Sequence, residues 1–120
     1  MAGPSGDASS DVVRAAWAAV DAAAGGAEGA LALANLAQIL DRSGRSAAAL
    51  DAWRRVRALA TGRLAARAAY AIGVGLQESG KRAEAIAAFG QAKSEGTASG
   101  DLMIAAAAAD RLADLGVAPR

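Results

Sequence analysis

The sequence predicts an all-α protein built from helix-turn-helix units, and three observations support this class. Hydrophobic residues make up 54% of the chain but aromatic residues only 3%, because most of the apolar content is alanine, the strongest helix former. Runs of β-branched and aromatic residues typical of strands are absent, and no proline lies between Pro4 and Pro119. The third observation is an internal repeat of 36 residues.

Several columns of similar residues share this period. They are Trp17, Trp53 and Phe89; Gly44, Gly80 and Gly116; Leu40, Leu76 and Leu112; Ala37, Gly73 and Ala109; and Val13, Ala49 and Ala85. A period of this size indicates stacked supersecondary units. At 120 residues the chain is long enough for one such domain but too short for two independent cores.

Each unit is predicted to contain two helices joined by a glycine turn. Apolar residues recur at steps of three and four on both sides of each glycine, and glycine ends a helix in the left-handed conformation at little cost. The predicted helices are 11–24, 29–43, 46–60, 63–78, 82–94 and 101–115, with loops around Thr61 and Thr97 between units. A flexible N-terminal tail, 1–10, and a C-terminal tail, 117–120, flank the domain over 11–116.

The segment AYAIGVGLQESGKRAEAIAAFGQA, residues 69–92, resembles the tetratricopeptide repeat signature. The matching residues are Ile72, Gly73, Leu76, Gly80, Ala85, Phe89 and Ala92. Residues 31–56 match less strictly, the period exceeds the family's 34 residues, and the closing proline is missing. The resemblance implies a right-handed solenoid of about six antiparallel helices, with two full units between half units. The first helix resembles the second half of a unit, and 101–115 resembles the first half.

Composition excludes several classes of function. The formal net charge is +1, and the chain has no cysteine and no histidine, which removes thiolate chemistry, imidazole bases and the usual zinc ligands. We therefore expect no enzyme activity, metal or cofactor. The glycines of the segment Gly73-Val74-Gly75 fit the spacing of neither the dinucleotide-binding fingerprint nor the P-loop. The acidic pair of Asp110 and Asp114 is best interpreted as solvated helix surface.

One dense basic run could mark a nucleic-acid surface. It consists of Arg54, Arg55, Arg57, Arg63 and Arg67. Helical spacing distributes these side chains over different faces, and no aromatic residues for base stacking are interleaved with them. A solvated outer face is the favoured interpretation, and we expect no nucleic-acid partner.

The family resemblance implies a concave groove lined by the first helix of each unit. The predicted groove residues are Leu31, Asn35, Gln38, Arg42, Arg67, Tyr70, Val74, Gln77, Met103 and Asp110. Tyr70 is the best single candidate, because it lies outside the packing column of the other three aromatics. The alternative is that Tyr70 only caps the core. The lysine, asparagine and arginine with which some family members grip a C-terminal carboxylate are missing from the matching positions.

These features predict a protein-protein interaction module that holds a peptide or protein segment in the groove. The alternative is a structural assembly module that associates with copies of itself, or extends a longer array, through its end helices. The apolar last helix favours this alternative, because its outer side has no predicted cover. The polar first ten residues contain no secretory signal, and no apolar run is long enough to span a membrane. A soluble, cytoplasmic protein of bacterial type is expected.

Overall fold

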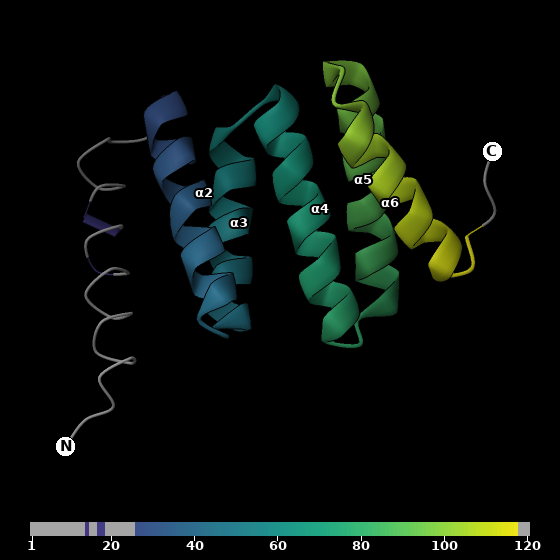
Figure 1. Ribbon diagram of the computed structural model, residues 1–120, viewed down its shortest axis with the longest axis horizontal. Coiled ribbons are helices and arrows are strands. Elements are labelled where there is room, and N and C mark those ends of the chain that lie inside the picture. Colours follow the sequence, from purple (N-terminus) through teal and green to yellow (C-terminus); the bar gives the residue numbers. More distant parts are fainter. Residues whose placement is uncertain (1–13, 15–16, 19–25, 118–120) are drawn as a thin grey trace. The chain divides into compact units, whose positions relative to one another are not determined.

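A computed structural model describes residues 14, 17, 18 and 26–117 of the chain. Within these residues there are five helices and no strand: α2 (Gly26–Arg42), α3 (Ser46–Leu59), α4 (Gly62–Glu78), α5 (Arg82–Ser99) and α6 (Leu102–Asp114) (Figure 1). The sequence predicts six. The predicted first helix, 11–24, lies mostly outside the described residues, although Arg14, Trp17 and Ala18 are helical. The predicted tails, apart from Val117, also lie outside them. The all-α class is confirmed.

The chain divides into two compact units, Met1–Leu59 and Ala60–Arg120. In the first unit α2 packs against α3. In the second unit α5 packs against both α4 and α6, and α4 also contacts α6. Each unit therefore contains one helix pair of the predicted kind, and the second unit adds the further helix α6.

The glycine column ends three helices in the way the sequence predicts. Gly44, Gly80 and Gly116 have φ angles of +75°, +78° and +84°. After each glycine, the next backbone N–H donates to the carbonyl five residues earlier at 2.9 Å, as from Lys81 to Leu76. This hydrogen bond is the mark of a Schellman motif, which satisfies carbonyl groups at a helix end. The prediction that these glycines terminate helices is confirmed.

The prediction that the fifth helix ends at residue 94, with a loop around Thr97, is wrong. Helix α5 continues to Ser99 and ends at Gly100, which has a φ angle of +79°. Asp101 N–H then donates to the Gly96 carbonyl at 2.8 Å. Gly96 is buried inside the helix, where an added Cβ would lie 3.0 Å from Ala105 N. This glycine permits close packing against α6 and is not a stop signal.

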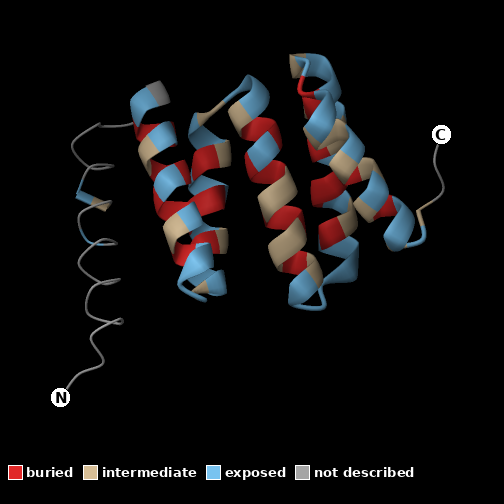
Figure 2. Ribbon diagram, in the orientation of Figure 1, coloured by how far each residue is buried: buried red, intermediate tan, exposed pale blue. Residues whose placement is uncertain are grey.

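The predicted packing columns form the core of each unit (Figure 2). In the first unit Leu36, Ala37 and Leu40 of α2 are buried with Ala49, Trp53 and Val56 of α3. The same columns are buried in the second unit, where Phe89 has no exposed surface. A Cβ added to Gly73 would lie 2.7 Å from the Phe89 ring. The ring therefore fills the space that the missing side chain of Gly73 leaves between α4 and α5.

Two glycine-to-alanine substitutions should have opposite effects on stability. Gly73→Ala would force the buried Phe89 ring to move, and overpacking costs about 1–3 kcal/mol, more than the roughly 1 kcal/mol that alanine gains in helix propensity. Gly90 lies inside α5 with no neighbour within 4 Å of an added Cβ, so Gly90→Ala should stabilise by about 0.5–1 kcal/mol. Urea midpoints of both variants test this contrast. A gain in stability for Gly73→Ala would contradict the close contact with Phe89.

Candidate functional site

In the second unit, three side chains surround the guanidinium of Arg111. Two of them, Tyr70 and Gln77, are predicted groove residues, and the third, Phe89, belongs to the core. The Tyr70 ring packs against Phe89, with ring centroids 5.5 Å apart and planes tilted by 59°. Arg111 of α6 donates from Nε to the Tyr70 hydroxyl at 3.2 Å, and its guanidinium carbon lies 5.8 Å from the centre of the same ring. Tyr70 is half-buried. It therefore caps the core through Phe89 and also presents part of its surface to solvent.

Arg111 also joins a second predicted groove residue to this cluster. One of its terminal nitrogens donates to the side-chain oxygen of Gln77 at 3.0 Å. Tyr70 and Gln77 lie about two turns apart on α4, so Arg111 bridges one face of α4 to α6. These two bonds use two of the five N–H donors of a guanidinium. The arrangement can therefore offer hydrogen-bond donors beside partly exposed aromatic surface.

Sequence reasoning missed Arg111 as a member of this site. In the repeat it occupies the same column as Ile39 and Gly75. A charged residue in a column that is otherwise uncharged is the signal that could have indicated a special role. Its partners, however, lie 34 and 41 residues away, and only the packed structure identifies them.

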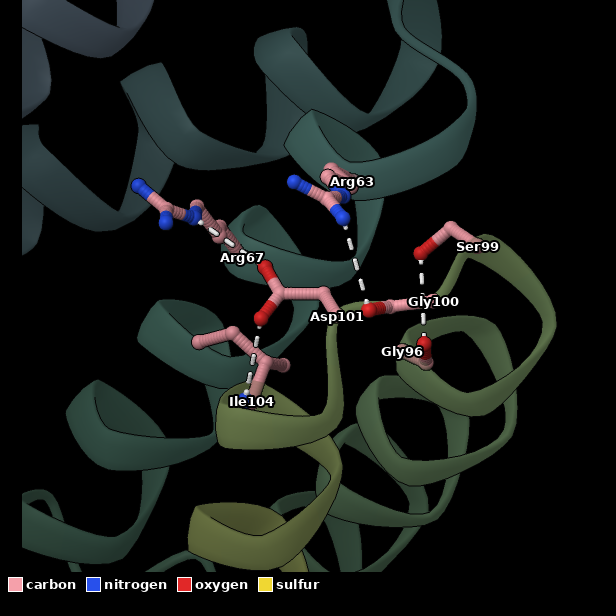
Figure 3. Close-up of polar contacts among 7 residues, drawn as sticks. All are labelled: Arg63, Arg67, Gly96, Ser99, Gly100, Asp101 and Ile104. Atoms are coloured by element: carbon pink, nitrogen blue, oxygen red, sulfur yellow. Dashed lines mark hydrogen bonds and ion pairs between the residues drawn. The ribbon is translucent and has the colours of Figure 1, made fainter.

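A second polar cluster holds the start of α6 against α4 (Figure 3). The Asp101 carboxylate is buried, accepts from Arg67 Nε at 3.3 Å, and accepts from Ile104 N–H at 3.3 Å. The second bond makes Asp101 the N-cap of α6. Arg63 reaches the Gly100 carbonyl at 3.4 Å. Arg67, a predicted groove residue, thus has a structural partner, although its side chain stays 63% exposed.

The other predicted groove residues lie on exposed or half-exposed surface. Val74 is half-buried on α4, while Met103 and Asp110 are exposed on α6. Met103 is 84% exposed. The predicted residues of α2 belong to the first unit, and all four are exposed: Leu31, Asn35, Gln38 and Arg42. The structure therefore brings Tyr70 and Gln77 together through Arg111.

The arginine side chains of the basic run lie in different environments. Arg54 is exposed on α3, and Arg57 is half-buried. Arg55 is exposed, but its guanidinium carbon lies 4.7 Å from the centre of the Trp17 ring. This cation-π contact was not expected from an arginine interpreted as a solvated outer side chain. Arg63 and Arg67 instead contact the turn between α5 and α6.

The described residues contain neither a metal-binding cluster nor a membrane-spanning helix. No group of three or more acidic residues in this part of the chain is arranged to hold a metal ion. Among the same residues, no helix is both long enough and apolar enough to span a membrane. Asp110 and Asp114, the acidic pair considered from the sequence, are both exposed.

Comparison of the chain with protein-family models, curated proteins and solved structures found no match.

Proposed function

We propose that this chain is a protein-interaction module of the tetratricopeptide type that binds a peptide or protein segment on the face formed by α4 and α6. Stacking of its units into a right-handed solenoid is part of the proposal. A cytoplasmic location is also part of the proposal. Nucleic acid is not the proposed partner, because the basic run has no interleaved aromatics.

The cluster of Tyr70, Gln77 and Arg111 is the observation that carries this proposal. It places an aromatic ring and unused guanidinium donors on one face, and tyrosine and arginine are enriched among residues that dominate binding energy. Met103 adds exposed apolar surface on α6. Apolar side chains of a partner can bind there, while polar atoms of its backbone meet the arginine.

Tyr70 and Met103 should both matter for binding. A random-peptide library is selected on the wild-type chain, and the affinity of the selected peptides is measured for variants. Tyr70→Ala should weaken binding by about thirtyfold, which corresponds to roughly 2 kcal/mol. Met103→Glu should weaken it as well and leave the fold intact, because Met103 is already 84% exposed. Far-UV circular dichroism of each variant monitors helicity.

Two further variants serve as controls for this binding test. Arg54→Ala, on the exposed surface of α3, should leave the affinity unchanged. Tyr70→Phe keeps the ring against Phe89 and removes only the hydroxyl that accepts from Arg111. Selected peptides that bind Tyr70→Ala and Met103→Glu as tightly as wild type would rule out this face.

A second function, structural assembly, is favoured by a different observation. Two large apolar residues at the start of α6, Leu102 and Met103, are 67% and 84% exposed. Exposed apolar surface at the end of a repeat stack can be buried by a further repeat. We propose assembly through this end of the chain as the alternative to peptide binding.

A further inference from the structure

Helices α4 and α6 each contribute a stripe of half-buried side chains to one surface of the second unit. The residues of each stripe recur at steps of three and four, which places them on one side of their helix. They are Tyr70, Val74 and Gln77 on α4, and Ile104, Ala107 and Arg111 on α6. Arg111 donates to both Tyr70 and Gln77, so the two stripes lie side by side. Polar groups gather around Arg111, and the rest of the surface is apolar.

The positive charge of Arg111 is paired with no carboxylate of the described residues. Its two acceptors, the Tyr70 hydroxyl at 3.2 Å and the Gln77 side-chain oxygen at 3.0 Å, are both neutral. Its guanidinium carbon lies 5.8 Å and 6.0 Å from the ring centres of Tyr70 and Phe89. Asp110 and Asp114, on the same helix, are exposed. A cation is thus partly removed from water without an anion to offset the cost.

The other arginine side chain that pairs α4 with α6 through a charge already has its anion. Arg67 donates from Nε to the buried Asp101 carboxylate at 3.3 Å (Figure 3). A second carboxylate that approached Arg67 would be repelled by Asp101, because like charges in one site oppose each other. Arg111 is therefore the arginine of this surface at which an incoming carboxylate gains most.

Arg111 retains the hydrogen-bond donors that a carboxylate needs. Its described bonds use Nε and Nη1, which leaves one N–H of Nη1 and both of Nη2. Nη2 can therefore donate to a carboxylate while the bonds to Tyr70 and Gln77 stay in place. A backbone carbonyl can accept the same bond, but it has no charge to offset the cation. A phosphate group carries up to two charges and is bound by clusters of arginines, whereas Arg111 stands alone in this stripe.

We infer that Arg111 binds an aspartate or glutamate side chain of the peptide segment, while apolar side chains of that segment pack on Val74 and Ile104. The inference rests on the peptide-binding function proposed above and names the chemistry of its partner. The residues that would grip a C-terminal carboxylate are missing from the chain, so the anion is assigned to a side chain within the segment. Hydrogen bonds between ionised groups are stronger than neutral ones, so this contact should select among segments of similar shape.

A double-mutant cycle tests the pairing of Arg111 with this acidic side chain. Peptides are selected from a random library in which each carboxyl terminus is fused to a carrier, so that no C-terminal carboxylate is present. An acidic residue should be enriched at one position of the selected peptides. Replacing it with the corresponding amide residue should weaken binding to the wild-type chain by about tenfold. For Arg111→Gln the same replacement should change the affinity by less than about twofold, because the charge that it met is gone.

Two further variants control for net charge and for loss of structure. Arg54→Gln removes an equal charge from the exposed surface of α3, and the amide peptide should still bind it about tenfold more weakly than the acidic peptide. Arg111→Lys keeps the positive charge and should still prefer the acidic peptide. The peptide replacement measured on the wild-type chain leaves the protein unchanged, so its result does not depend on how Arg111→Gln affects the packing of α6. Far-UV circular dichroism measures the helicity of each variant.

The outcomes distinguish this inference from the peptide-binding function. If no peptide is selected, or if the selected peptides bind Tyr70→Ala and Met103→Glu as tightly as wild type, both are overturned. Peptides that depend on Tyr70 but show no enriched acidic residue would overturn the inference alone. So would an amide replacement that weakens binding equally for wild type and Arg111→Gln. A tighter complex with phosphoserine at the acidic position would identify a phosphate site and overturn the assignment to a carboxylate.

Discussion

Phe89→Ala should destabilise the second unit by about 3–5 kcal/mol, the usual cost of truncating a buried phenylalanine. Phe89 has no exposed surface, and its ring packs on Gly73 and against Tyr70. Because residue 73 on the facing helix is glycine, it has no side chain that could move into the space. The cavity should therefore persist, and the cost should fall in the upper part of this range. Urea unfolding followed by far-UV circular dichroism measures it.

Phe89→Leu is the matched comparison for this prediction. Leucine keeps most of the buried volume, and swaps between large apolar residues usually cost less than about 1.5 kcal/mol. The difference between the two variants isolates the cavity from the loss of the aromatic contact with Tyr70. Equal midpoints for Phe89→Ala and Phe89→Leu would show that the ring does not fill a tight space.

The repeat columns explain why much of the fold was predictable. A glycine that must end a helix and an aromatic that must fill a gap each leave a periodic trace in the sequence. Gly80 and Phe89 were identified in this way, and the structure places one in the left-handed conformation and the other in the core. Helix α4 begins and ends within one residue of its predicted bounds.

The structure differs from the sequence-based prediction where a residue that is a poor helix former serves packing between helices instead of ending a helix. The sequence predicts a loop around Thr97, where the closing proline of the tetratricopeptide signature is missing. In the folded chain Gly96 lies against the backbone of α6, and Thr97 bonds to the Lys93 carbonyl within the helix. The stop signal is Gly100 instead. Composition alone cannot separate a glycine that ends a helix from one that admits a neighbouring helix.

The candidate site was only partly predictable for a related reason. The register of the repeat indicated Tyr70 and Gln77, because both lie off the packing columns of α4. The hydrogen bonds that join them to Arg111 span 41 and 34 residues. Such bonds depend on how α4 and α6 pack. No repeat column encodes them, because Arg111 shares its column with Ile39 and Gly75.

Trp53→Ala should be the most damaging single change in the first unit, again by about 3–5 kcal/mol. Trp53 is 7% exposed and occupies the same column as Phe89. It also donates from its indole nitrogen to an Asp41 carboxylate oxygen at 3.2 Å. Trp53→Phe separates the two contributions, because it installs the residue that the second unit uses and removes the hydrogen bond. That bond should contribute about 0.5–1.5 kcal/mol, since Asp41 is exposed and regains water when its partner is lost.

The control is Arg54→Ala, the adjacent exposed residue on α3, which should shift stability by less than about 0.5 kcal/mol. Far-UV circular dichroism is the appropriate probe, because Trp53→Ala removes one of the two tryptophans that fluorescence would follow. If Trp53→Ala unfolds at the same urea concentration as Arg54→Ala, the aromatic column does not carry the packing of α2 against α3.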